Sequence, residues 1–107
     1  MCGIAGQWHP EGRPIDPGRL RAMAHAIAHR GPDGEGIFCA PGIGLAHRRL
    51  SIIDLAGGAQ PIANEDDSIH VVFNGEIFNY LELRASLIAC GHRFRTHSDT
   101  ETLVHLY

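Results

Sequence analysis

Apolar stretches in this 107-residue chain are short, because charged residues, glycine and proline interrupt every one of them. None approaches the about 18 consecutive apolar residues that a membrane-spanning helix needs, so we expect no membrane segment. Hydrophobic residues make up 44% of the chain and charged residues 20%. This composition supports one modest core and predicts a single small domain of short strands and helices.

Charge and cysteine content narrow the class of protein. The net charge is −3, and basic residues are interspersed with acidic ones, so we expect neither a nucleic-acid-binding nor a membrane-binding surface. A small neutral or zwitterionic ligand fits better. The three cysteines, Cys2, Cys39 and Cys90, are widely spaced and form no CxxC pair, which argues against a disulfide framework and favours the cytoplasm. We expect Cys39 and Cys90 to be buried, inert thiols.

The first half of the chain predicts one helix among three strands. Asp16 and Pro17 are typical of a helix start, apolar residues follow at helical spacing, and Gly31 with Pro32 should end the helix. Strands are expected at 2–9, 35–39 and 43–50, the last two joined by a turn at 40–42. Alternation in the third strand places four residues on one face: Ile43, Leu45, His47 and Arg49.

The second half predicts a loop at 57–61 and then strands and helices in alternation. A strand at 69–73 should stop at Asn74-Gly75, and a short strand is expected at 93–97. Two capping boxes, Asn79 with Glu82 and Ser98 with Glu101, predict two helix starts, and Gly91 should end the first of these helices. The chain finishes on an apolar run without a stop signal, so we expect a fragment of a longer protein.

The histidines do not predict a metal site. His25 and His29 lie four residues apart on a helix, but no third ligand is evident, and a solvated helix face is the more common explanation. His47 is more simply explained as a packed neighbour of Arg49 than as a catalytic base. The chain also contains no phosphate-binding loop or other nucleotide-binding motif.

Cys2 could be unusually reactive because of its position. If Met1 is removed, Cys2 carries a thiol and a free α-amine on one residue, and an amine that titrates close to neutral pH can take the thiol proton. Nucleophile and base would then share a residue. Taken alone, a small apolar residue that happens to be cysteine remains the more common explanation.

Six ordered blocks reverse that balance, because together they resemble the class II glutamine amidotransferases, which are N-terminal-nucleophile hydrolases. Within that family they are most similar to the glutaminase domain of glutamine-hydrolysing asparagine synthetases. The blocks are Met1-Cys2-Gly3-Ile4-Ala5-Gly6, His29-Arg30-Gly31-Pro32-Asp33, Ala46-His47-Arg48-Arg49-Leu50-Ser51-Ile52-Ile53-Asp54, Gly58-Ala59-Gln60-Pro61, Phe73-Asn74-Gly75-Glu76-Ile77 and Ser98-Asp99-Thr100-Glu101.

The resemblance implies catalytic roles for Cys2, Asn74 and Gly75. A carboxamide is a poor electrophile, so its cleavage needs a strong nucleophile and donors aimed at the developing oxyanion. The resemblance makes Cys2 the nucleophile and gives the oxyanion hole to Asn74 and Gly75. From the residues alone, an ordinary hairpin turn is the more common explanation of Asn-Gly.

The resemblance also implies substrate-binding roles for four residues: Arg49, Leu50, Glu76 and Asp99. Free glutamine carries a carboxylate and an ammonium, and arginine can grip a carboxylate through two parallel N–H bonds. Arg49 would bind the carboxylate, while Asp99, with Glu76 as a second acidic contact, would bind the ammonium. A surface charge, or a helix cap at Asp99, is the alternative for these residues.

The implied fold is α+β, a four-layer αββα sandwich of which residues 1–107 form only the N-terminal part. In asparagine synthetases ammonia passes to a C-terminal domain that activates aspartate with ATP and Mg²⁺, whereas the glutaminase step needs no cofactor. That synthetase domain is absent from this sequence, and a homodimer is left open. The alternatives are a glutaminase with another acceptor, a non-catalytic fragment and a plain structural domain.

Overall fold

The structure of this chain is a computed structural model that describes residues 2–50 and 58–107. Met1 and residues 51–57 lie outside the described residues, and with them the predicted loss of Met1, residues 51–54 of the third block and the first residue of the loop at 57–61. In chain order the elements are β1 (Gly3–Trp8), α1 (Pro17–Ala26), the 3-10 helix η1 (Ala28–Arg30), β2 (Gly34–Ala40), β3 (Ile43–Arg49), β4 (Ile62–Ala63), β5 (His70–Val71), α2 (Tyr80–Ala89) and α3 (Glu101–Leu106).

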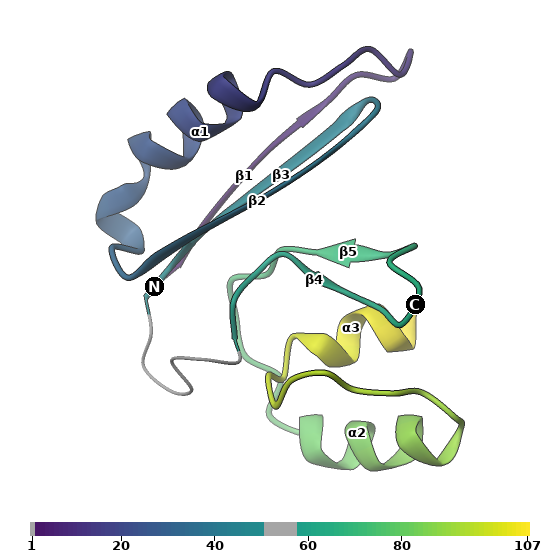
Figure 1. The fold of residues 1–107 in the computed structure, drawn as a ribbon. Helices are drawn as coiled ribbons and strands as arrows, with labels where there is room; N and C mark the ends of the chain where they lie inside the picture. Colours follow the sequence, from purple (N-terminus) through teal and green to yellow (C-terminus); the bar gives the residue numbers. More distant parts are fainter. Residues whose placement is uncertain (1, 51–57) are drawn as a thin grey trace.

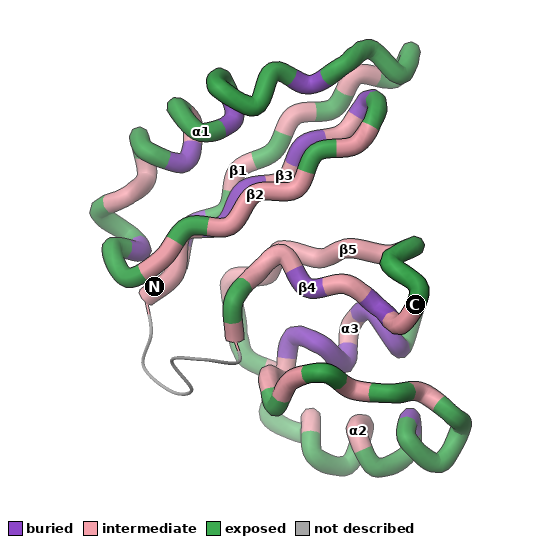
Figure 2. Tube along the Cα trace, viewed as in Figure 1, coloured by how far each residue is buried: buried purple, intermediate pink, exposed green. Residues whose placement is uncertain are grey.

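β1, β3 and β2 form an antiparallel sheet in that order, and α1 covers one of its faces (Figure 1). The three predicted strands in this part of the chain are confirmed. The buried residues of α1 lie on the side of the helix that faces the sheet (Figure 2). The core between helix and sheet consists of Ile15, Leu20, Ala24 and Ala46. Removing their apolar surface from water is the main force that holds α1 on the sheet.

The predicted start of α1 is confirmed, but its end is not. The Oδ1 atom of Asp16 accepts a hydrogen bond of 2.9 Å from the backbone N–H of Gly18, and Pro17 is the first helical residue. Regular helix stops at Ala26, and η1 continues the chain up to Gly31. The glycine therefore ends the helical region but not α1 itself.

The hairpin between β2 and β3 follows the prediction. Gly42 adopts a φ of 83°, a left-handed conformation that glycine tolerates without strain. Leu45 and His47 lie on the face of β3 opposite the α1 core, as the alternation predicts, while Ala46 points into that core.

The β4–β5 pair lies on the other side of the sheet from α1, and α3 and α2 follow beyond it (Figure 1). The rings of Phe38 on β2 and His70 on β5 stack with centroids 3.8 Å apart, which joins the two sheets. The strand predicted at 69–73 is shorter than expected, because the N–H of Phe73 donates to the side chain of Gln60 (2.6 Å) and not to a neighbouring strand. Helices with separate antiparallel sheets agree with the predicted α+β class.

The predicted end of α2 is confirmed, whereas its predicted capping box is wrong. Gly91 has a φ of 101°, and its N–H donates to the carbonyl of Ile88 (3.0 Å), while His92 N–H donates to that of Leu87 (3.0 Å). This pair of bonds is a Schellman ending. Asn79 makes no side-chain capping bond, because its φ and ψ of −98° and 24° depart from the extended conformation that a cap requires.

The predicted capping box at Ser98 and the predicted strand at 93–97 are both wrong for one reason. The Glu101 carboxylate turns inward and accepts the backbone N–H groups of Arg95 (2.9 Å) and Thr96 (2.7 Å), which a strand would have used for pairing. The Ser98 hydroxyl accepts from Thr100 N–H (3.2 Å), two residues on. A buried carboxylate thus replaces both local motifs.

Cys39 and Cys90 are exposed, so the prediction that they are buried is wrong. Cys39 lies on β2 at the edge of the sheet, and Cys90 caps the C-terminal end of α2, where neighbouring residues are also exposed. No helix in the described part of the chain is long and apolar enough to cross a membrane.

Candidate functional site

The sulfur of Cys2 contacts the backbone of Leu50 at the end of β3. The N–H of Leu50 donates to Sγ over 3.4 Å, and Sγ lies 3.9 Å from the carbonyl oxygen of the same residue. Cys2 is half-buried, and its own carbonyl accepts a hydrogen bond of 3.3 Å from Nε of Arg30. These contacts fix a partly accessible thiol at the start of β1. Arg30 has no predicted role, although it lies in one of the six blocks.

The segment from Gly31 to Asp33 lies along the end of β3. The carbonyl of Gly31 accepts from Nε of Arg48 (3.0 Å), and the N–H of Asp33 donates to the carbonyl of Arg49 (2.9 Å). A side chain at Gly31 would overlap the carbonyl of Arg48, so the close approach requires glycine. This block therefore holds the strand end that carries Arg49 and Leu50.

A cavity of about 550 Å³ opens beside Arg49. Its lining combines cationic, anionic and neutral polar groups, which suits the zwitterionic ligand predicted from the sequence. The lining residues are Asp33, Gly34, Glu35, Gly36, His47, Arg49, Ala59 and Gln60. Cys2, Asn74 and Asp99 are not among them.

His47 is the buried member of this lining, with 1% of its surface exposed. Neither ring nitrogen has a hydrogen-bond partner among the described residues. Burial lowers the pKa of His47 below 6.5, the nearby Arg49 charge lowers it further, and the backbone of Phe73 opposes the shift. His47 is thus a neutral, packed residue at neutral pH, in agreement with the prediction that it is a neighbour of Arg49.

Gln60 connects the cavity to the loop that contains Asn74 and Gly75. Its Oε1 atom accepts from Phe73 N–H (2.6 Å) and its Nε2 donates to Oγ1 of Thr100 (3.4 Å). A Cβ on Gly75 would lie 2.6 Å from the ring of Phe73, so a larger residue there would require the ring to move. Gln60 has no predicted role, because no sequence motif around this loop residue indicates that its side chain would bond to both Phe73 and Thr100.

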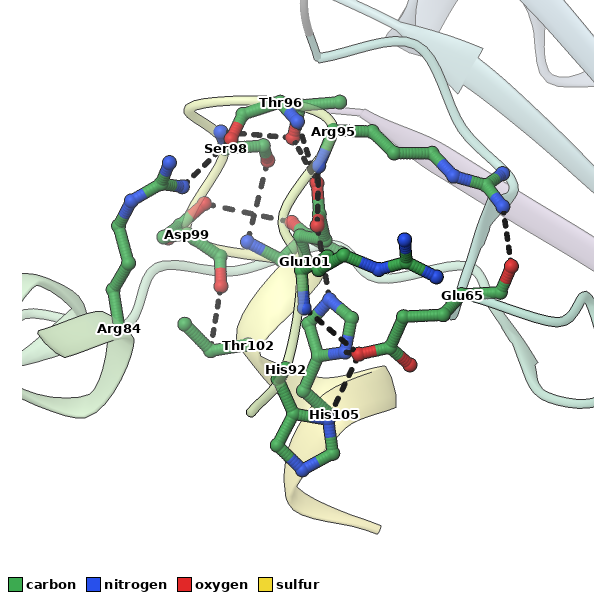
Figure 3. Close-up of polar contacts among 12 residues, drawn as sticks. Glu65, Arg84, His92, Arg95, Thr96, Ser98, Asp99, Glu101, Thr102 and His105 are labelled. Atoms are coloured by element: carbon green, nitrogen blue, oxygen red, sulfur yellow. Dashed lines mark hydrogen bonds and ion pairs between the residues drawn. The ribbon is translucent and has the colours of Figure 1, made fainter. Parts of the chain in front are cut away.

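Asp99 contacts the other end of the same loop. Its Oδ2 atom accepts from Ile77 N–H (2.8 Å), and its backbone carbonyl accepts from the Thr102 hydroxyl (2.7 Å, Figure 3). Its carboxylate therefore anchors the loop end and does not cap α3, for which no side-chain cap bond exists. Glu76 is exposed within this loop, and Asn74 is half-buried.

The predicted site residues thus fall into two groups. Cys2, Leu50 and Arg49 lie together at the end of β3, and Asn74, Gly75, Glu76 and Asp99 form the second group. No hydrogen bond within residues 2–50 and 58–107 joins Cys2 to the second group. The side chain of Gln60, which lines the cavity beside the first group, bonds to Phe73 and Thr100, the sequence neighbours of Asn74 and Asp99 in the second group.

Comparison with known proteins finds relatives that match the whole chain. A family model described as a glutamine amidotransferase domain matches residues 1–107. Two relatives from Bacillus subtilis (strain 168), asparagine synthetase [glutamine-hydrolyzing] 1 and 2, are 46% and 50% identical over 110 residues. Asparagine synthetase [glutamine-hydrolyzing] 3 of Arabidopsis thaliana is 46% identical over 108 residues. Each comparison covers 100% of this chain, which spans 17%, 14% and 18% of the three relatives in turn.

Proposed function

The chain belongs to the glutamine amidotransferase domain family, and from this premise we propose that it hydrolyses the side-chain amide of glutamine with Cys2. The ammonia released would serve ATP-dependent synthesis of asparagine from aspartate. The observation that carries the proposal is the position of the Cys2 sulfur, 3.4 Å from the backbone nitrogen of Leu50. Leu50 directly follows Arg49, which lines the cavity. The names of the relatives support asparagine as the product.

The first chemical step breaks the amide bond and forms a thioester. After loss of Met1, the α-amine of Cys2 takes the thiol proton and the thiolate attacks the carboxamide carbon. The Asn74 side-chain amide and the Gly75 backbone N–H donate to the oxyanion, and the amine returns the proton to the leaving nitrogen as ammonia departs. Removal of one such donor costs about 2.7–4 kcal/mol of transition-state stabilisation.

The second step consumes water and releases glutamate. The same α-amine takes a proton from water, hydroxide adds to the thioester carbon, and the thiolate leaves and is protonated again. Arg49 binds the substrate carboxylate, and the backbone of Leu50 contacts the bound substrate. Asp99 with Glu76 binds the ammonium. No cofactor takes part in either step.

The proposal extends to the protein as a whole. The α1 layer, the two sheets and the α3–α2 layer would be the first part of a four-layer αββα N-terminal-nucleophile hydrolase sandwich. A C-terminal synthetase domain would bind ATP and Mg²⁺ and receive the ammonia, in a cytoplasmic protein that could form a homodimer. No residue of this chain is proposed to bind ATP or its Mg²⁺.

An electrophilic glutamine analogue tests the glutaminase step. Because Cys39 and Cys90 are exposed, the test uses a Cys39→Ala/Cys90→Ala background, so that only Cys2 can be labelled. We expect one covalent label per chain by mass spectrometry, protection by glutamine, and none after Cys2→Ala. Glutamine hydrolysis at an unchanged rate in Cys2→Ala would overturn the proposal. In the full-length protein, hydrolysis without asparagine formation, when aspartate, ATP and Mg²⁺ are supplied, would instead indicate another acceptor.

A further inference from the structure

Three segments that are far apart in the sequence bring Glu65, His92 and His105 together (Figure 3). Glu65 follows β4, His92 follows α2, and His105 lies within α3. The Oε1 atom of Glu65 is 2.9 Å from Nδ1 of His92 and 3.0 Å from Nδ1 of His105. The family blocks contain none of these three residues, and the sequence predicted no metal site.

Neighbouring groups hold His92 and Glu65 in place. The Schellman ending at Gly91 positions His92, and the N–H of Arg93 donates to Oε1 of Glu65 (3.0 Å). The guanidinium of Arg95 donates to the backbone carbonyl of Glu65 (2.8 Å). Such preorganisation distinguishes this cluster from exposed acidic groups that meet only transiently.

Glu101 determines which nitrogen of His105 carries a proton. The Glu101 carboxylate already accepts two backbone N–H groups and the hydroxyl of Thr96, so it acts only as an acceptor. Nε2 of His105, 2.9 Å from Oε2 of Glu101, is therefore the donor.

Nδ1 of His105 consequently faces Glu65 with a lone pair when the ring is neutral. This nitrogen is buried and makes no hydrogen bond with any described residue, although Oε1 of Glu65 lies 3.0 Å away. The same Oε1 atom also accepts the N–H of Arg93 (3.0 Å), so Glu65 acts here as an acceptor. Two electron-rich atoms at this distance repel unless a cation lies between them.

We propose that Glu65, His92 and His105 form a binding site for one divalent transition-metal ion of the zinc type. The ligands are a carboxylate oxygen of Glu65 and the Nδ1 atoms of the two imidazoles, and these ligand atoms lie within 4.8 Å of one another. Tetrahedral zinc at about 2.0–2.1 Å from each ligand needs ligand separations of about 3.3 Å. The separations of 2.9 Å and 3.0 Å between Oε1 of Glu65 and the two Nδ1 atoms must therefore widen only by tenths of an ångström. Water fills the fourth position.

Glu101 acts in this site as a positioning residue. A metal-bound histidine commonly donates its second N–H to a carboxylate, which fixes the ring and raises its basicity, and His105 with Glu101 has this arrangement. The ion would tie the segment after β4 to α3 and to the end of α2. It would thereby stabilise the half of the chain that carries Asp99, independently of glutamine hydrolysis.

Titration of the purified, metal-free protein with Zn²⁺ and Co²⁺ tests the site. We expect one saturable site, a tetrahedral Co²⁺ absorption spectrum without a thiolate charge-transfer band, and a higher melting temperature with Zn²⁺. His92→Ala and Glu65→Gln should each weaken binding by more than about tenfold, since loss of an outer-shell partner alone costs about 10–100-fold. His97→Ala, which removes an exposed histidine outside the cluster, is the matched control and should leave the affinity unchanged.

The two ligand variants guard against a trivial failure. The His92 side chain is 35% exposed, and Glu65→Gln keeps an acceptor for the N–H of Arg93, so both should fold. Absence of saturable binding, or equal affinity in wild type and both variants, would overturn the proposal. The cation between His105 and Glu65 would then be a proton.

Discussion

Gly36→Ala should separate the loop that carries Gln60 from the sheet. Gly36 lies on β2 opposite His47, and the segment that begins at Gln60 crosses directly over it. An added Cβ would overlap the carbonyl oxygen of Gln60 and lie 2.8 Å from its carbonyl carbon and 3.1 Å from Cδ of Pro61. The obstacle is mainly backbone, which cannot rotate away as the end of a flexible side chain can.

The cost follows from two effects. Overpacking a close contact costs about 1–3 kcal/mol. Displacement of Gln60 also removes the acceptor from Phe73 N–H, now bonded at 2.6 Å, and an unsatisfied, partly buried donor costs about 1–3 kcal/mol. Alanine returns about 0.4–1 kcal/mol by restricting the unfolded chain. We therefore expect Gly36→Ala to lower the free energy of unfolding by about 1–5 kcal/mol.

Gly34→Ala provides the matched control on the same strand. A Cβ at Gly34 would meet only Cβ of Arg49 at 3.7 Å, an ordinary contact, so this variant should be neutral or more stable by up to about 1 kcal/mol. Urea unfolding, with the slope checked for constancy, measures both variants. If the two midpoints agree within error, the loop is not held against Gly36 and the link from cavity to Asn74 is refuted.

Three further outcomes are expected. Arg49→Lys loses bidentate binding of the carboxylate, so KM for glutamine should rise about 10–100-fold with little change in kcat; an unchanged KM would contradict this role. Asp99→Ala should cost about 1–3 kcal/mol in urea unfolding because Ile77 N–H loses its acceptor, whereas Asp99→Asn keeps an oxygen there and should raise KM only. Equal unfolding of both variants would exclude the anchoring role. The lowered pKa of His47 means that the unfolded chain binds the proton first; its stabilisation is full above pH 6.5 and lost as pH falls through the folded-state pKa. His47→Gln should flatten that decline in urea unfolding, and an identical slope would contradict it.

The sequence predicted those features that depend on neighbouring residues. Asp16 with Pro17 starts α1, Gly42 turns the β2–β3 hairpin, and Gly91 ends α2, because each of these conformations is set within a few residues. The family blocks likewise mark residues that meet in the structure: Leu50, at the end of β3, contacts Cys2. The catalytic and binding roles within those blocks stay predictions.

Features decided by distant partners could not be predicted in this way. Ser98 and Glu101 have the spacing of a capping box, but the Glu101 carboxylate serves Arg95, Thr96 and His105 instead. The same competition removes the strand at 93–97. The proposed metal site at His105 could not be predicted from the sequence either. Its partner Glu65 is 40 positions away and comes close only when α3 meets the segment after β4.

The loop from Asn74 to Glu76 illustrates how long-range side chains prepare a site that local pattern only marks. Its two flanks are fastened by side-chain acceptors, since Gln60 takes Phe73 N–H and Asp99 takes Ile77 N–H. The N–H of Gly75 donates to no described residue, and the Phe73 ring packs against Gly75. A loop fixed at both ends keeps an N–H available in its middle, which is what donation to a transient oxyanion requires. A hairpin turn would have used strand pairing at both flanks, so this arrangement favours the oxyanion role over the turn.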